Sequence, residues 1–342
     1  MIKLRKQLAV CIQNDYMDSL VTAYPLCIAL ADTDFVPWYY ENYLEIYSLL
    51  ADEFLQISYN DGMSYINNEF SPLKVTTVPY DFLPDNMIDM MIRCIDQAYY
   101  LVLFVDEYYM KKSAIYLEEH YNHECLLYGY DTNHRIFNAV RFIYGELIKD
   151  EVKFDDIAEA LNSAKKLDIR FDFSEDHELH LISKKMFKKP YLFCVNRLKS
   201  KLKGYRLSDM RPSDLYFRRI KDYNYQIGID TYDAVVEHVM LCYINRHQYS
   251  VNAIRAFYDH KKGVLARLSY VYEQKKVTEF GGLIKEYQFL VSRINNIRRL
   301  YFKMSMVKDV TVKGKIKDQL ICELLMCKDL DKELIDRVLA LI

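Results

Sequence analysis

The sequence is poor in residues that interrupt regular structure. Only nine glycines and seven prolines occur among its 342 residues, whereas there are 31 tyrosines and 17 phenylalanines. Disordered chains have the opposite composition, with few aromatic residues and many prolines and glycines. The sequence therefore predicts a folded chain of long regular elements. Its length and its 51% of hydrophobic residues predict two domains with sizeable cores.

Long apolar runs are also missing. No stretch reaches the roughly eighteen uninterrupted apolar residues that a membrane helix requires. The first segment, MIKLRKQLAVCIQND, has an apolar core too short for a secretory signal peptide. We therefore expect a cytoplasmic protein that does not bind a membrane.

Several motifs that mark enzyme and cofactor classes are absent. The eight cysteines are scattered, without a CxxC pair or a Cys/His cluster at zinc spacing, so neither a disulfide framework nor a metal site is expected. No GxGxxG, GxxxxGK, HExxH or GxSxG motif occurs, which disfavours nucleotide-binding, zinc-protease and serine-hydrolase functions. We expect no cofactor. The tyrosine pairs and basic runs are typical of core aromatics and solvated helix faces, so no nucleic-acid partner is expected.

The net charge is only −2, but it is unevenly distributed. Residues 1–160 carry 11 basic and 26 acidic residues, and residues 161–342 carry 35 and 22. One interpretation is that the second half binds an acidic partner, and the other is that two oppositely charged domains attract each other. The sequence leaves both open.

Hydrophobic periodicity predicts an α+β fold followed by a helical bundle. Strands are expected at 73–80, 99–109 and 124–131, and the last forms a hairpin with 136–145. Tyr39, Tyr43, Ile46, Tyr47 and Leu50 predict a helix, and from about residue 213 the pattern is purely helical. We therefore expect an α+β domain at residues 1–205 and an all-α helical bundle at residues 206–342.

Cys11 and His123 are the candidates for chemistry. Cys11 falls near a predicted strand-to-helix junction, where a helix N-terminus stabilises a thiolate, and His123 precedes a buried strand and is a candidate base. Cys11 is alternatively a small buried hydrophobe. Cys125 lies on the same strand face as His123 and is a rival thiol, although core packing suits it better. His120 is typical of a surface residue.

The block HYNHECLLYGYD, the strand VLFVDEYY, the strand IFNAVRF and Cys11 at a helix start together resemble the family of butirosin biosynthesis protein H. That family is similar to the papain-like cysteine peptidases fused to bacteriocin exporters. The resemblance spans about residues 5–165 and implies a papain-like domain with Cys11 as nucleophile and His123 as base. The third group falls at Asn138, which can hold the imidazole tautomer, or at Ala139, which would leave it missing.

The resemblance also implies a function. In this family an acyl group moves from a carrier-protein thioester to an amine, so it implies a Cys-dependent acyltransferase of bacterial natural-product or antibiotic biosynthesis. An acidic acyl or peptidyl carrier protein and a small-molecule or peptide amine acceptor would be its partners. The alternative is a catalytically incomplete scaffold that binds a carrier protein or a peptide intermediate. A true peptidase is disfavoured, because Gln7 is oddly spaced for an oxyanion glutamine and Ile12 replaces the usual glycine.

Overall fold

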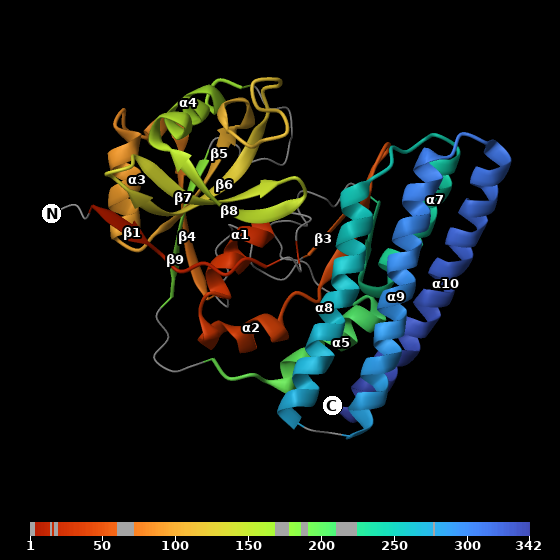
Figure 1. Cartoon of the computed structure of the whole chain (residues 1–342). Coiled ribbons are helices and arrows are strands. Elements are labelled where there is room, and N and C mark those ends of the chain that lie inside the picture. Colours follow the sequence, from red (N-terminus) through yellow and green to blue (C-terminus); the bar gives the residue numbers. More distant parts are fainter. Residues whose placement is uncertain are drawn as a thin grey trace. The chain divides into compact units, whose positions relative to one another are not determined.

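A computed structural model shows that the chain combines antiparallel sheets with a helical C-terminal region (Figure 1). It forms two compact units. The sheet unit comprises Met1–Val36 and Met63–Pro190, and the helical unit comprises Pro37–Gly62 and Tyr191–Ile342. The sequence predicts one domain boundary, near residue 205, whereas the chain passes from one unit to the other three times. The structure describes residues 4–13, 16, 20–59, 72–167, 178–185, 191–209, 224–275 and 278–342.

A seven-stranded antiparallel sheet forms the centre of the sheet unit. Its strands follow the order β4-β9-β5-β6-β7-β8, and β1 pairs with the end of β6 beyond β5. The hairpin expected between residues 124 and 145 is β6 and β7, whereas the sequence pattern does not predict β8. The strands are β1 Arg5–Gln7, β4 Leu73–Pro79, β5 Tyr100–Asp106, β6 Asn122–Asp131, β7 Ile136–Ile143, β8 Glu146–Lys153 and β9 Glu178–Lys184.

Helices cover both faces of this sheet (Figure 1). Helices α3 and α4 lie on one face, where their apolar residues share a core with Cys125, Leu127 and Ala139. Helix α1 lies on the other face, and its Tyr24 hydroxyl donates to the backbone oxygen of Glu124 at 2.9 Å. The helices of this unit are α1 Leu20–Ala29, α3 Met87–Asp96 and α4 Phe154–Ala164, with 3-10 turns η1 Thr33–Phe35, η2 Tyr80–Phe82 and η3 Glu107–Tyr109.

The helix predicted over Tyr39 to Leu50 is wrong. Helix α2, Val36–Glu41, ends before Tyr43, whose φ of 61° is left-handed, and strands β2, Ile46–Leu50, and β3, Leu55–Tyr59, follow as a hairpin. Strand β10, Asn224–Ile227, pairs with β2 and completes a small sheet. The side chains of Ile46, Leu55 and Ile57 in this hairpin, and of Leu44 just before it, lie in the core of the helical unit. This distant packing outweighs the local helical pattern.

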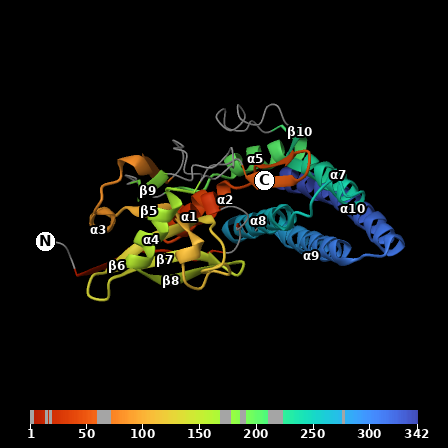
Figure 2. The same cartoon turned by 90° about the horizontal axis from the view of Figure 1, so that it is seen from above.

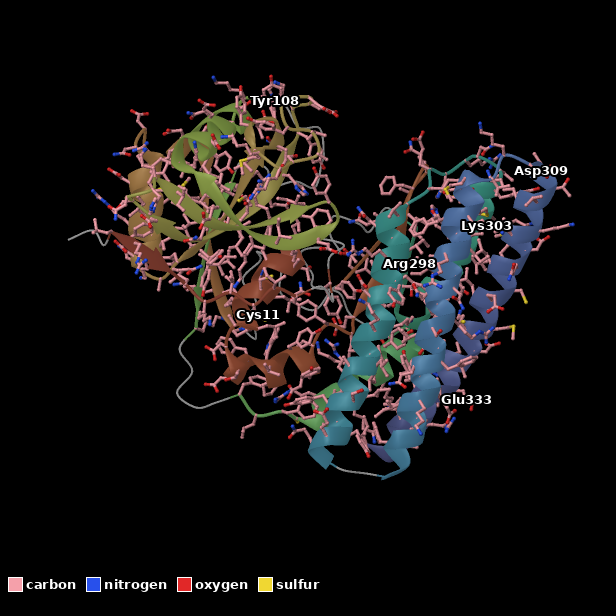
Figure 3. All side chains as sticks on the ribbon, in the orientation of Figure 1. Cys11, Tyr108, Arg298, Lys303, Asp309 and Glu333 are labelled. Carbon is pink, nitrogen blue, oxygen red and sulfur yellow. The ribbon has the colours of Figure 1, made fainter. Side chains whose placement is uncertain are left out.

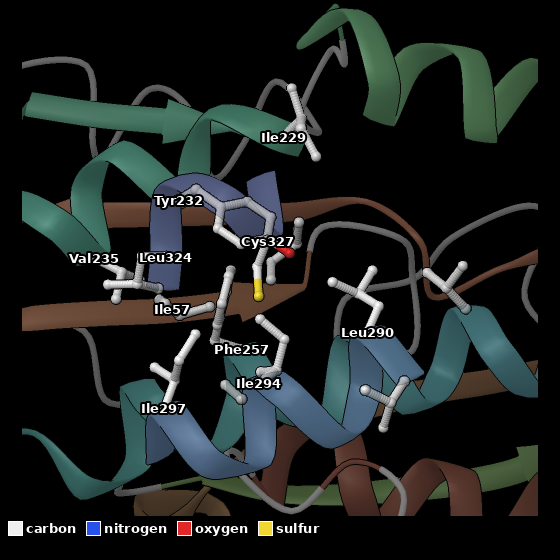
Figure 4. Close-up of a cluster of buried hydrophobic side chains, with 14 of the residues drawn as sticks. Ile57, Ile229, Tyr232, Val235, Phe257, Leu290, Ile294, Ile297, Leu324 and Cys327 are labelled. Carbon is white, nitrogen blue, oxygen red and sulfur yellow. The ribbon is translucent and has the colours of Figure 1, made fainter. Parts of the chain in front are cut away.

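Long helices form most of the helical unit. Helices α8, α9 and α10 lie side by side (Figures 1 and 2), and Phe257, Ile294 and Leu324 meet Ile57 of the hairpin in their core (Figure 4). None of the described helices is long and apolar enough to span a membrane. The helices are α5 Val195–Leu207, α7 Thr231–Tyr243, α8 Val251–Lys275, α9 Thr278–Met306 and α10 Val310–Leu341, with the 3-10 turn η4 Gly228–Asp230.

A fully buried ion pair lies inside the helical unit. Lys261 of α8 and Asp331 of α10 are completely inaccessible, and their charged atoms are 3.0 Å apart. The hydroxyls of Tyr205, Tyr232 and Tyr287 all donate to the Asp331 carboxylate, at 2.7, 3.2 and 3.0 Å. Because every partner comes from a different helix, this closed cluster fixes how α5, α7, α8, α9 and α10 pack.

Candidate functional site

Cys11 lies in residues 8–13, which follow β1 and have no regular secondary structure. Its backbone N–H donates to the oxygen of Cys27 in α1 at 2.9 Å, and its thiol is exposed. The interpretation of Cys11 as a buried hydrophobe is therefore wrong. The described part of α1 begins at Leu20, nine residues further on, so the expected position of Cys11 at a helix start is also wrong. The helix N-terminus whose positive end would favour a thiolate does not begin at Cys11.

His123 lies at the beginning of β6, as the sequence predicted for the edge of a buried strand. It pairs with Val105 of β5 and shares a strand face with Cys125, so its side chain is on the α3 and α4 side of the sheet. Its ring is 23% exposed, and its Nδ1 is 3.8 Å from a carboxylate oxygen of Glu107. The imidazole therefore has a charged partner and a route to solvent.

Cys11 and His123 belong to opposite faces of the sheet. Cys27, whose backbone oxygen accepts the hydrogen bond from Cys11 N–H, interacts electrostatically with Lys149. Lys149 of β8 lies opposite Val140 of β7 in the strand register. Val140 is adjacent to Ala139, which lies on the His123 side, so α1 and Cys11 lie on the other side. Figure 3 shows Cys11 well separated from Tyr108, the neighbour of Glu107. The structure does not bring the predicted nucleophile and base together.

Asn138 is also remote from His123. It pairs with Gly129, six residues along β6 from His123, which is about 20 Å at the rise of an extended strand. Its side chain packs over Gly129, where an added Cβ would be only 2.7 Å from the Asn138 Oδ1 atom. The alternative residue, Ala139, lies on the correct face but is apolar and fully buried. The hairpin register thus supplies His123 with no third group from either position.

His123 instead adjoins a cluster of buried charges. Arg141 of β7 is 2% exposed and binds Glu107 at 3.0 Å and Asp150 of β8 at 3.1 Å. It also donates to the backbone oxygen of Lys111 at 2.6 Å, and the exposed Lys112 pairs with Asp150. We call Glu107, His123, Arg141 and Asp150 the His123 cluster. It is closed on the Arg141 side and open to solvent at His123.

The charges of the cluster control its protonation. Burial acts to raise the pKa of Glu107, but His123 and the positive charge of Arg141 outweigh burial and hold that pKa below its usual range. Burial acts to lower the pKa of His123, but the carboxylates of Glu107 and Glu124 outweigh burial and raise it. The pairing therefore favours an imidazolium opposite a carboxylate.

A second histidine and carboxylate pair lies next to this cluster. Asp106 is fully buried and accepts hydrogen bonds from Ser163, at 2.6 Å, and from the backbone N–H groups of Tyr108 and Tyr121. Its Oδ2 is also 2.6 Å from Nδ1 of the half-exposed His120, whose ring stacks on Tyr108 at 4.3 Å. These bonds outweigh the effect of burial and lower the pKa of Asp106. His120 is therefore held in place by a buried carboxylate.

The other sequence candidates serve the fold. Cys125 is buried in the core between the sheet and α3 and α4, and burial raises the pKa of its thiol to about 12, as core packing predicts. Gln7 is in β1, where its amide donates to the Tyr128 hydroxyl at 3.3 Å. No group of three or more His, Cys, Asp or Glu side chains that would hold a metal ion occurs within the described ranges.

The sequence patterns considered above do not predict a role for Arg141 or Asp150. Arg141 stands inside the apolar strand IFNAVRFI, and a charged residue at a core-facing position of a strand requires buried acids as partners. Asp106 and Glu107, at the end of the apolar strand β5, are the acids in the sequence that best fit this requirement. Together these residues offer ionic and hydrogen-bonding contacts to a ligand. The Cys125 thiol, which interacts electrostatically with Arg141, Glu107 and Asp150, is buried and its pKa is raised, so it is not activated.

No model of a protein family matches the chain, and no curated protein matches it significantly in sequence.

Proposed function

We propose that this protein is a catalytically incomplete papain-like scaffold of bacterial natural-product biosynthesis, which binds a carrier protein or a peptide intermediate. The family and the pathway follow from the resemblance of Cys11, HYNHECLLYGYD and the flanking strands to butirosin biosynthesis protein H. Binding is preferred to acyl transfer because of the positions of the two residues on which acyl transfer depends.

One observation carries this preference: Cys11 and His123 are on opposite faces of the same sheet. Nucleophilic catalysis by cysteine requires the base within hydrogen-bond reach of the thiol, about 2.6–3.2 Å. A sheet cannot be crossed by a change of rotamer. Acyl transfer through Cys11 and His123 would require a different strand register or a different position of α1.

The electrostatics of His123 suits a binding role. The neighbouring carboxylates raise the pKa of His123 and favour its protonated form. An imidazolium at the open side of a buried ionic cluster suits recognition of a negatively charged or carbonyl group. Binding uses this charge, and acyl transfer through Cys11 does not.

Thiol labelling followed by intact-mass analysis tests this proposal. Cys11 and Cys322 are both exposed, so Cys322 is an internal standard for an unactivated surface thiol. With limiting iodoacetamide, Cys11 is expected to react within about threefold of the rate of Cys322, because neither thiol is hydrogen-bonded to a base within the described ranges. The His123→Ala variant is expected to leave both rates unchanged.

Other results would favour acyl transfer over the scaffold function. Rapid labelling of Cys11 alone, slowed in His123→Ala, would require a working Cys–His pair and would contradict the scaffold. Transfer of an acyl group from a carrier-protein thioester to Cys11, absent in Cys11→Ala, would do the same. Binding of the unacylated carrier protein to both wild type and Cys11→Ala, with equal affinity, is the outcome expected of a scaffold.

A further inference from the structure

One end of the helical unit carries a strong positive charge. Pro37–Gly62 and Tyr191–Ile342 together contain 28 basic and 22 acidic residues, a net charge of +6. Residues 298–318 alone contain seven basic residues and two acidic ones, a net charge of +5. This segment runs through the last part of α9, the turn after it and the first part of α10. We call it the basic end.

Three lysines of the basic end are not part of an ion pair among the described residues. Lys303, Lys308 and Lys315 are exposed, and among the described residues none has an acidic partner within ion-pair distance. The two acids of the segment are already engaged, because Asp309 caps α10 by accepting from Val312 N at 2.8 Å and Asp318 pairs with Lys317. Figure 3 shows Lys303 and Asp309 near the turn between α9 and α10, and Glu333 towards the other end of α10.

The opposite end of these helices is electrically different. There Arg337 pairs with Glu286 at 2.6 Å and with Glu333 at 3.5 Å, so the surface charges of α9 and α10 compensate each other. Positive charge that is left uncompensated at one end only produces a local field, and such a field attracts negatively charged partners. The distribution therefore distinguishes the basic end from an ordinary solvated helix surface.

Exposed apolar side chains accompany the lysines. Met306 is 74% exposed and Val310 is 69% exposed, and Ile244 at the end of α7 is also exposed. Helix α7 adjoins α10 here, because Lys317 lies over the Tyr243 ring at 4.9 Å. Apolar side chains surrounded by charges of one sign are typical of protein interfaces, which have an apolar centre and a polar rim.

We propose that the basic end, with Ile244, is the docking surface for the acidic carrier protein of the proposed function, on which this inference rests. The unpaired lysines complement an acidic face, and Met306 and Val310 give that face an apolar contact. A membrane surface fits less well, since the exposed apolar residues here are methionine, valine and isoleucine, without the Trp or Phe that favour a lipid interface. Nucleic acid would leave these apolar groups without a partner.

Charge reversal at the basic end tests the surface. The variant Lys303→Glu/Lys308→Glu is compared with Lys203→Glu/Lys285→Glu, which reverses two exposed lysines elsewhere in the helical unit. Binding of a fluorescently labelled bacterial acyl carrier protein to the full chain is measured by anisotropy at low and physiological salt. The first variant is expected to weaken binding by at least about tenfold, and the control by less than about twofold.

The remaining variants separate charge from apolar contact. Met306→Ser/Val310→Ser is expected to weaken binding by about tenfold at both salt concentrations, because an apolar contact is not screened. Circular dichroism verifies that each variant keeps its helices. Equal losses of carrier-protein affinity in the basic-end and control variants would contradict the proposed docking surface.

The outcomes for the surface and for the function differ. A carrier protein that binds wild type and the basic-end variant equally would overturn the docking surface and leave the scaffold function intact. No binding to wild type would overturn both. Tighter binding to phosphatidylglycerol vesicles or to a DNA duplex than to the carrier protein, lost in the same variant, would replace the protein partner by a membrane or a nucleic acid.

Discussion

The two units of this protein each bury a group of charges, but the two groups differ in their access to solvent. In the helical unit, Lys261 and Asp331 are fully inaccessible, and three tyrosine hydroxyls occupy the remaining acceptor positions of the carboxylate. In the sheet unit, Arg141 is equally buried, but its cluster ends at His123, which is partly exposed. The first group is closed and the second is open.

This difference separates a structural role from a binding role. A closed ionic group has no position left for a ligand, so its contribution is to fix the packing of the helices that supply it. An open group keeps one charged side chain at the surface, where an incoming group can exchange with water. Of the two clusters, the His123 cluster is therefore the one able to recognise a partner.

The largest effect is expected from breaking the closed group. Asp331→Ala leaves the ammonium of Lys261 buried without its counter-ion, and the free energy of unfolding should fall by about 3–5 kcal/mol. Urea unfolding followed by far-UV circular dichroism measures this change. The matched control is Asp336→Ala, whose partner Arg206 forms an exposed pair, and its cost should be about 0–1 kcal/mol. Similar losses in both variants would show that the buried group is not special.

A smaller effect is expected from opening the His123 cluster further. Arg141→Met removes the shared partner of Glu107 and Asp150, but His123 and Lys112 still face these carboxylates. The free energy of unfolding should fall by about 2–3 kcal/mol, the cost of leaving buried acceptors partly unsatisfied. Arg135→Met, in the turn of the same strand hairpin, removes an exposed pair with Asp155 and a contact with the Phe154 ring, and serves as control. A loss as large as that of Asp331→Ala would mean that the two clusters are equally closed.

The smallest effect is the response of the sheet unit to pH. The pKa values of Asp106 and Glu107 are lowered by folding, so their stabilisation is present above their ordinary values of 3.8 and 4.5 and is lost as pH falls through the folded values. The pKa of His123 is raised by folding, so its stabilisation is present below its ordinary value of 6.5 and is lost as pH rises through the folded value.

Thermal unfolding across this pH range measures both effects. The contribution of these groups should be greatest between about pH 4.5 and 6.5 and should decrease on either side. Glu107→Gln should flatten the alkaline side, because the raised pKa of His123 depends on that carboxylate. An alkaline side that keeps its slope in Glu107→Gln would assign the effect to another group.

Local pattern predicted the sheet unit better than the site. The alternation in LKVTTVP and the apolar run of YLVLFVD correspond to strands β4 and β5, and the turn after Asp131 gives the expected hairpin. These elements are determined by residues close in sequence. The segment from Tyr39 to Leu50 could not be assigned in this way, because β2 pairs with β10, about 180 residues away.

The prediction of the candidate site was wrong for a related reason. Sequence spacing cannot show on which face of a sheet a residue lies unless the position of every neighbouring helix is known. His123 was placed correctly at the edge of its strand, but the face that carries α1, and with it Cys11, depends on packing. Asn138 was excluded by the hairpin register, in which a shift of one residue reverses the face of every side chain. Arg141 was detectable, since charge inside an apolar strand demands a partner.

The β2–β10 pair also has a consequence for how the chain is made. Residues 46–50 leave the ribosome long before residues 224–227, so the hairpin of β2 and β3 must wait for its third strand while the sheet unit is being synthesised. Domains usually fold during synthesis in order from the N-terminus, but the helical unit here cannot be completed until most of the chain has emerged. A gene fragment that starts at residue 206 would encode long helices without α5, β2 and β3, and its product would expose the apolar surface that these elements cover.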